Sequence, residues 1–402
     1  MFQNKNYFII IVIVFHFYGA PLKAQLSPFE LGGYVKNLST LFQGNFYDLP
    51  LDLGKYQNGT QLRLNFFWYA NGNLIFTAQG RSMFSYQKNV RTYENLLQSF
   101  SNSSYYFDSK ITYVDNPDFS AYTEIDRLNM DWSFSNFETV LGRQRIVWGA
   151  CLVWNPTDLF NPFNILNFDY DERPGTDALS LNYYVGAVSQ LNFAFTPGRT
   201  AEQIIYAGRY LFNKWDYDFA LISGWQKKMW RLGFNWAGNL LDGGFRGEIL
   251  FSKPDINYDQ TVYILPGYRG KMLSDPFWTI SLSYDYTFAS GLYLHTEYLY
   301  NELGVTEEAG YRQYEIVQTG ELSPARHSLF QEAAYDITPL LRGDIFIIFN
   351  PNDYSFILAP SLSYSLSSNW DAYLLSFISD GKAGSEFGGY PNQYFLRFKY
   401  SF

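Results

Sequence analysis

Hydrophobic and polar residues alternate along most of this chain, and the alternation is cleanest over the last nine residues. Side chains on a β-strand point to opposite faces with a period of two. One face of this segment carries Tyr394, Leu396, Phe398, Tyr400 and Phe402. The opposite face carries Phe395, Arg397, Lys399 and Ser401. The pattern predicts a terminal strand with one apolar face and one mainly polar face.

The same period divides the chain after residue 24 into about eighteen strand-like segments. Clear examples are residues 61–68, 230–236, 278–287 and 355–364. Pro360 lies inside one of these segments, and a proline is tolerated within a strand where the strand has a β-bulge. A soluble β-sandwich rarely keeps this alternation in every strand, whereas a barrel in lipid requires it. We therefore predict an all-β fold, a transmembrane antiparallel up-and-down barrel of about 18 strands, or 16 if one hairpin is misassigned.

Connector lengths follow the alternation expected of such a barrel, with short turns at the periplasmic end and long loops outside. If the last strand ends in the periplasm, the long connectors near 85–121, 150–178, 253–276 and 303–326 all fall outside. The opposite connectors are short and contain turn residues such as Asn71-Gly72 and Ser290-Gly291.

Residues 1–24 have the features of a secretory signal peptide. Lys5 precedes an apolar run over residues 8–15, and Lys23-Ala24 comes just before the expected cleavage point. The alternative is a transmembrane anchor, but this run is about half of the ~20 residues needed to span a bilayer. We expect a signal peptide at 1–24 and a barrel domain at 25–402.

The final strand resembles that of bacterial outer-membrane barrel proteins, whose chains commonly end on an aromatic residue. The resemblance implies an integral protein of the Gram-negative outer membrane, in contact with its lipid. It also implies that the barrel-assembly machinery binds this strand, with Phe402 and Tyr400 as the assembly signal.

Composition agrees with a membrane barrel and excludes several other classes. Aromatic residues make up 20% of the chain, although its mean hydropathy is slightly negative at −0.19. The net charge is −9, and removal of Lys5 and Lys23 takes it to −11, so nucleic acid is not an expected partner. Cys151 is the single cysteine and cannot form an internal disulfide.

The sequence offers little for catalysis, and we expect no enzyme, cofactor or metal. Only His295 and His327 remain after signal removal, and no metal-binding or nucleotide-binding motif is present. Outer-membrane phospholipases use a Ser-His pair on a barrel, so His295 is a weak candidate. Its place beside Glu297 on a polar face favours a hydrogen-bonded histidine inside the barrel instead.

The least generic segment is Leu141-Gly142-Arg143-Gln144-Arg145-Ile146-Val147-Trp148-Gly149. It resembles a Gly-Arg-Gln strand of porin-superfamily barrels, including alginate-export and phosphate-selective types. The resemblance implies that Arg143 and Arg145 contribute charge to a channel, and the alternation then turns Gln144 and Ile146 toward lipid. The loop 150–178 is the natural one to fold inward. The alternative is that Gly142, Gly149 and the prolines only shape a packed external loop.

Charged residues on the polar faces are candidates for lining a channel, where they would set ion preference. The candidates are Arg63, Arg127, Asp131, Arg143, Arg145, Arg231, Arg246, Glu297, Arg342 and Arg397. The alternative for each is an ion pair across strands that braces the wall.

These observations lead to two hypotheses. The first is an outer-membrane porin-like channel for passive diffusion of small hydrophilic solutes, with a weak anion preference. The second is a non-conducting barrel that serves as a surface scaffold or as a component of secretion or polysaccharide-export machinery. A TonB-dependent transporter is poorly supported, because such transporters have about 22 strands and a plug domain for which this chain has no room. The sequence leaves open whether the barrel forms a homo-oligomer.

Overall fold

A computed structural model describes residues 27–44, 55–88, 106–161, 169, 172, 175–255, 275–312 and 319–402. The expected signal peptide at 1–24 lies outside the described residues, as do parts of all four long connectors.

The described residues form nineteen strands and a short 3-10 helix, η1 (Ala309–Arg312). The first nine strands are β1 (Phe29–Gln43), β2 (Tyr56–Asn71), β3 (Leu74–Gln87), β4 (Ile111–Asp115), β5 (Phe119–Phe134), β6 (Phe137–Gln144), β7 (Thr176–Tyr184), β8 (Gln190–Thr196) and β9 (Ile205–Lys214). The remaining strands are β10 (Tyr217–Gln226), β11 (Met229–Leu240), β12 (Gly243–Pro254), β13 (Phe277–Thr287), β14 (Tyr293–Asn301), β15 (His327–Thr338), β16 (Leu341–Phe349), β17 (Phe356–Ser367), β18 (Trp370–Asp380) and β19 (Asn392–Ser401).

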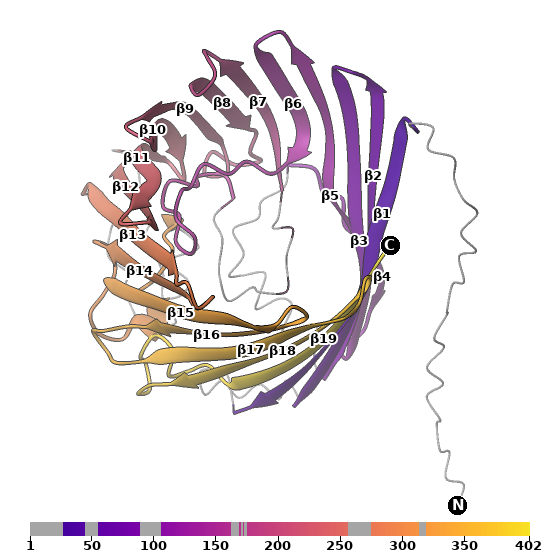
Figure 1. Cartoon of the computed structure of the whole chain (residues 1–402), viewed down its shortest axis with the longest axis vertical. Helices are drawn as coiled ribbons and strands as arrows, with labels where there is room; N and C mark the ends of the chain where they lie inside the picture. Colours follow the sequence, from indigo (N-terminus) through magenta and orange to yellow (C-terminus); the bar gives the residue numbers. More distant parts are fainter. Residues whose placement is uncertain are drawn as a thin grey trace, which may run out of the picture.

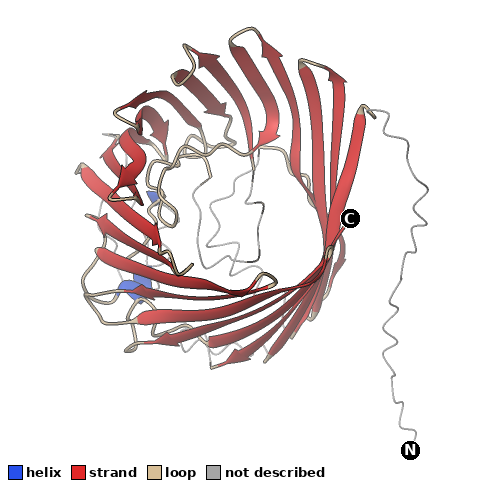
Figure 2. Cartoon of the chain, in the orientation of Figure 1, coloured by secondary structure: helices blue, strands red, loops and turns tan. Residues whose placement is uncertain are grey.

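The strands close into one antiparallel barrel (Figures 1 and 2). β1 pairs with β2 on one side and with β19 on the other, so the described sheet has no open edge there. β4 pairs only with β5, which leaves eighteen strands in the ring. The predicted all-β barrel of 18 strands is confirmed, and the alternative of 16 is wrong.

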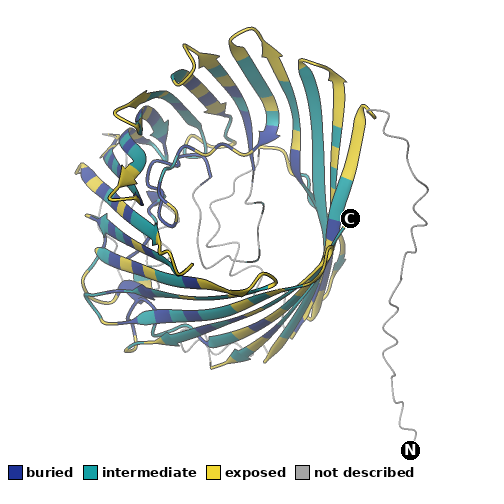
Figure 3. Ribbon diagram, viewed as in Figure 1, coloured by how far each residue is buried: buried dark blue, intermediate teal, exposed yellow. Residues whose placement is uncertain are grey.

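Residues of different burial alternate along the strands (Figure 3), and the exposed positions are mainly apolar, as expected of a wall that faces lipid. On β2, Arg63 is 0% exposed and points inward, whereas its neighbour Leu64 is 45% exposed on the outer face. Outward aromatic residues such as Trp68 and Trp278 cover the wall with the apolar surface that lipid requires. Among the described residues, no helix is long and apolar enough to cross a membrane.

The two ends of the barrel differ in the length of their connections. Eight turns at one end span between two and five residues, from the β2–β3 turn to the β17–β18 turn. Several are tight turns with positive φ, including Trp215 (57°) and Asp216 (61°) between β9 and β10. The connections at the other end include all those that exceed twenty residues.

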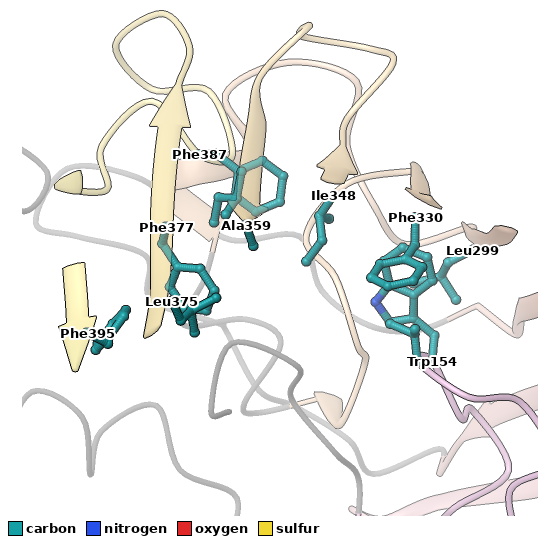
Figure 4. Packing of buried hydrophobic residues seen from close by; sticks show 11 residues of the cluster. Trp154, Leu299, Phe330, Ile348, Ala359, Leu375, Phe377, Phe387 and Phe395 are labelled. Carbon is teal, nitrogen blue, oxygen red and sulfur yellow. The ribbon is translucent and has the colours of Figure 1, made fainter. Parts of the chain in front are cut away.

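Part of the inner wall is apolar. Leu375, Phe377 and Phe395 belong to a buried cluster on the inner side of β14–β19 (Figure 4). Val153 and Trp154, from the segment after β6, and Phe387, from the connection after β18, complete this cluster. The space inside the ring is therefore partly filled by chain that packs against the wall.

Candidate pore constriction

A glycine lies near the end of β6, just before the chain leaves the wall. Gly142 has φ of +117°, and a Cβ there would lie 2.3 Å from the backbone oxygen of Leu128. Glycine is therefore required at this close approach. β6 ends two residues later. β4 pairs with residues 120–123 of β5, and β6 pairs with residues 128–134 along the same edge of β5. β4 thus fills the wall where β6 departs.

Arg143 seals this junction. Its Nε and Nη2 donate to Asp177 at 2.8 and 3.1 Å, and Nη1 donates to the backbone oxygen of Ile125 at 2.7 Å. Further bonds reach Ser109 Oγ and the backbone oxygen of Phe107. The side chain is 4% exposed, so Arg143 braces the wall and has almost no surface with which to contact a solute.

The faces predicted for Gln144 and Ile146 are wrong. Gln144 and Ile146 were expected to face lipid, but both are 6% exposed. Gln144 donates to the backbone oxygens of Val140 and Ala178, and Ile146 belongs to an inner apolar cluster with Trp148. The expectation is wrong because Leu141, 52% exposed, lies on the outer face of β6, and a period of two from Leu141 places Gln144 on the inner face. Arg145 remains exposed beyond the end of β6.

The next residues run inside the ring, as the trace that follows β6 shows in Figure 1. Glu248 on β12 is 0% exposed and binds this segment at two places. Its Oε1 accepts from the backbone N–H of Ala150 at 2.6 Å and of Cys151 at 2.8 Å. Its Oε2 accepts from the backbone N–H of Thr157 at 2.8 Å and from Thr157 Oγ1 at 2.7 Å.

Glu297 on β14 holds the residues between these two contacts. Its carboxylate accepts from the backbone N–H groups of Leu152, Val153 and Trp154 at 3.2, 3.1 and 2.5 Å. Glu297 is also 0% exposed. Two buried carboxylates thus receive six backbone N–H groups, which satisfies groups that otherwise have no partner in an irregular segment. We call Glu248 and Glu297 the glutamate clamp.

The clamped segment packs against a long arc of the inner wall. Leu159 and Phe160 join an apolar cluster with residues of β7–β12, and Arg209 lies 5.4 Å from the ring centre of Trp148. Trp154 packs on Phe330 at 6.4 Å between ring centroids. The segment is therefore fixed along the β7–β19 side of the ring by hydrogen bonds and by packing.

The remaining part of the inner wall is basic. Six cations lie on β19, β1, β2, β3 and β5, which are consecutive in the ring. They are Arg397, Lys399, Lys36, Arg63, Arg81 and Arg127. Two pairs of like charge are direct cross-strand partners, Lys36 with Lys399 and Arg63 with Arg81. Like charges directly opposite one another are destabilising, so this wall needs anions beside it. We call these six residues the basic wall.

Carboxylates on neighbouring segments provide part of the compensation. Asp126 on β5 contacts both Arg63 and Arg81. Asp169 lies 3.0 Å from Lys36 and 3.4 Å from Arg397, and Glu172 lies 3.6 Å from Arg63. Asp169 and Glu172 come from the same connection as the clamped segment, so this connection carries carboxylates to the basic wall.

The barrel is similar to solved structures of other proteins, although its sequence matches none that is curated. No protein-family model and no curated protein matches the sequence. The structure is similar to that of OccAB4 of Acinetobacter baumannii, with a TM-score of 0.59 and 9% identity over 94% of this chain and 98% of that one. It is similar to OccAB3 of Acinetobacter baumannii at a TM-score of 0.55 and 12% identity, over 93% of this chain and 99% of that chain. The outer membrane protein OpdK of Pseudomonas aeruginosa gives 0.54 and 10%, with 93% and 98% covered.

The chain has the fold of outer-membrane porins. Its lipid-facing wall and closed hydrogen bonding make it an integral protein of the outer membrane, as predicted. The identities are too low to carry more than the fold from these structures to this chain.

Several other charged residues that we predicted to line the channel form ion pairs. Arg231 is 0% exposed and contacts Glu321 at 3.3 Å, and Arg246 contacts Asp285. Arg342 pairs with Asp336 at 3.1 Å near the end with short turns, where its side chain is 46% exposed. Asp131 lies opposite Val140 and forms no ion pair with another described residue. Bracing of the wall thus accounts for several of these charges, and their contact with a solute stays a prediction.

The sequence reading missed Lys36, Asp126 and Asp177 as members of this network. Lys36 could have been found, since it alternates with Val35 along β1. Asp126 could not, because it is the extra residue of a β-bulge on β5, opposite Gln79 and Gly80 of β3, and both Asp126 and Arg127 are buried. Period two by itself never predicts two adjacent residues on the same face.

His295 has the hydrogen bonds that we expected from its position, and one geometry of chemical interest. Ser283 Oγ lies 3.0 Å from its Nε2, and Glu332 lies 3.5 Å from its Nδ1. A serine, a histidine and a carboxylate in this order resemble the arrangement of an activated nucleophile. However, Ser283 and His295 are each 1% exposed, so a substrate has no access to the hydroxyl.

Proposed function

We propose that the barrel is a porin-like channel through which small hydrophilic solutes diffuse passively. The observation that carries the proposal is the clamped segment, which two buried carboxylates fix inside an eighteen-stranded ring. Inward charges beside it keep contact with water: the side chains of Arg246 and Arg397 are 24% and 17% exposed. Such an arrangement supports a narrowed, water-filled passage rather than a dry core.

A weak anion preference is part of the proposal. The basic wall has six cations, and four carboxylates lie beside it: Glu124, Asp126, Asp169 and Glu172. A local excess of positive charge raises the concentration of anions in a confined aqueous space. The resemblance of Leu141-Gly142-Arg143-Gln144 to alginate-export and phosphate-selective barrels supports the same preference, because alginate and phosphate are anions. The proposal includes no catalytic step and no cofactor.

Conductance in planar bilayers tests the channel, and reversal potential under a salt gradient tests its preference. We expect the wild type to favour anions weakly. Arg397→Gln combined with Lys399→Gln should shift the reversal potential toward cation preference, because it removes two of the six wall cations. Arg342→Gln is the matched control and should change little, since Arg342 lies at the end of the barrel and is 46% exposed. An unchanged reversal potential in the double variant would remove the basic wall from the solute path.

A second function, the non-conducting scaffold or export component, is favoured by one observation. Val153, Trp154 and Phe387 cover the apolar inner face of β14–β19, which reduces the space left for solute. The same bilayer measurement separates the two functions. A folded wild-type barrel with no conductance at any voltage would exclude the channel and favour the scaffold.

We also propose that the barrel-assembly machinery binds the last strand. Phe402 closes the ring, because its backbone N–H donates to Gly33 at 3.0 Å and its carbonyl accepts from Gly33 at 2.9 Å. Its side chain stays 49% exposed, and Tyr400 packs beside Trp370 at 5.0 Å between centroids. These aromatic side chains are accessible for recognition before closure.

A further inference from the structure

One histidine lies directly beside the glutamate clamp. His295 on β14 is 1% exposed, and its Nε2 lies 3.4 Å from Oε2 of Glu297. Its ring packs on Phe330 at 5.2 Å between centroids, and Phe330 packs on Trp154 of the clamped segment. Phe330 and Trp154 lie together in Figure 4. The segment therefore contacts the surroundings of this histidine as well as the carboxylate.

The oxygen of Glu297 nearest the histidine is already occupied by the segment. Oε2 accepts from the backbone N–H groups of Leu152 at 3.2 Å and Val153 at 3.1 Å. Oε1 accepts from the backbone N–H of Trp154 and from Ser281 Oγ. A carboxylate has about four lone-pair sites, two on each oxygen. A further donor at Oε2 therefore competes with Leu152 and Val153.

The two protonation states of His295 make different demands on this oxygen. Glu332 lies 3.5 Å from Nδ1, and an ionised carboxylate only accepts, so the proton of a neutral ring belongs on Nδ1. Nε2 is then an acceptor, and the hydroxyl of Ser283 donates to it at 3.0 Å. An imidazolium carries a proton on both nitrogens. Its Nε2–H must donate, and the carboxylate within reach of Nε2 is that of Glu297.

The other charged and titratable groups around His295 come from β12 to β16 in the described structure. Besides Glu297, they are Arg246, Asp285, Tyr293, Glu332, Arg342 and Asp344. Asp285 is the register partner of His295 but pairs with Arg246, and Asp344 lies next to Glu332. None of them offers Nε2 a second carboxylate. The side chain of Glu332 is 22% exposed, so it connects the buried ring to water.

We propose that protonation of His295 releases the clamped segment from Glu297. The proton turns Nε2 from an acceptor for Ser283 into a donor to Oε2, which takes this oxygen from Leu152 and Val153. Release leaves Oε2 free for the imidazolium, so proton uptake and release favour each other. The segment is therefore held at high pH and loosens as pH falls through the titration of His295. The effect on solute flow rests on the proposed channel, whereas the release itself does not.

Labelling of Cys151 tests the release without any conductance. Cys151 is the single cysteine, lies in the clamped segment and is 7% exposed, so a soluble maleimide reaches it mainly after release. The labelling rate of His295→Gln at each pH corrects for ionisation of the thiol, because glutamine does not titrate. We expect the ratio of the wild-type rate to this rate to rise about tenfold from about pH 10 to about pH 5, a span that covers imidazole titration. Tenfold corresponds to the loss of one hydrogen bond to a charged group.

Two further variants separate the release from a purely structural role of the histidine. Ser283→Ala removes the donor to the neutral ring, so the midpoint of the pH response should move to higher pH by about half a unit or more. This variant keeps the histidine and tests the same step if His295→Gln does not fold. His327→Gln is the matched control, because His327 bonds Tyr298 at 2.7 Å on the outer face of the wall. It should keep the wild-type response.

Bilayer recordings over the same pH range connect the release with the proposed channel. We expect conductance to rise as pH falls in the wild type and in His327→Gln, and to lose the part of this response that is due to His295 in His295→Gln. A labelling ratio that stays constant with pH would overturn the proposal, as would an unchanged midpoint in Ser283→Ala. A ratio that rises as pH falls in a barrel without conductance would support the release and exclude the channel alone.

Discussion

Replacing Glu297 by Ala removes the acceptor of three backbone N–H groups in the segment inside the ring. The carboxylate of Glu297 receives Leu152, Val153 and Trp154 at 3.2, 3.1 and 2.5 Å, and it is 0% exposed. The other member of the clamp, Glu248, remains in place in this variant. The change therefore loosens the middle of the segment without altering the strands of the wall.

The magnitude follows from these contacts. A hydrogen bond to a charged group contributes about 1.5–3 kcal/mol, so three give a gross value of about 4.5–9 kcal/mol. Part of this is recovered, because undocked N–H groups bind water inside the ring. We expect a net loss of about 2–4 kcal/mol in docking free energy. About 3 kcal/mol raises the undocked fraction by roughly two orders of magnitude.

Two assays report on the undocked segment. Single-channel recordings should show a larger or noisier conductance in Glu297→Ala, and a further increase when Glu248→Ala is added. Proteolysis of the detergent-solubilised barrel should cut the segment faster, with the wall intact. Asp285→Asn is the matched control, because Asp285 pairs with Arg246 and accepts from no residue of the segment. Unchanged conductance together with an unchanged cleavage rate in the double variant would refute the clamp as the anchor of this segment.

Three further predictions concern the wall and the external loops. Arg143→Glu should lower barrel stability by about 3–5 kcal/mol, because the new carboxylate is buried beside the carboxylate of Asp177. Thermal unfolding of the barrel measures this loss, and a stable variant with altered ion selectivity would contradict the prediction. Deletion of Phe402 should reduce outer-membrane yield without blocking export, because the bonds to Gly33 and the exposed ring are lost; fractionation and blotting decide, and normal yield counts against the assembly signal. Burial, reinforced by a nearby carboxylate, raises the pKa of Glu386 to about 8, so Glu386 takes up a proton on folding and the stability of this loop should fall as pH rises from about 4.5 to about 8. Protease resistance of the loop should follow this fall in the wild type and become independent of pH in Glu386→Gln. An unchanged pH dependence in Glu386→Gln would exclude Glu386 as its source.

The sequence by itself determined the wall of this protein. Alternation with a period of two predicted the all-β barrel, its count of about eighteen strands and the two faces of the final strand. The prediction succeeded because lipid outside and water inside impose the same rule on every strand. Each strand therefore carries its own evidence, and Arg397 beside Phe398 indicates inside and outside without any knowledge of neighbouring strands.

Only the tertiary structure decided what lies within the ring. Gln144 and Ile146 lie in the interior and not on the expected lipid face, because the outward Leu141 sets which face of β6 each residue occupies. The clamp joins Glu248 and Glu297 to residues that precede them by 91 to 145 positions. Their partners are backbone N–H groups, which every residue except proline has, so no side-chain pattern marks them. Local alternation fixes the direction of a side chain in a strand, whereas contacts between a strand and an irregular segment depend on where the whole chain has folded.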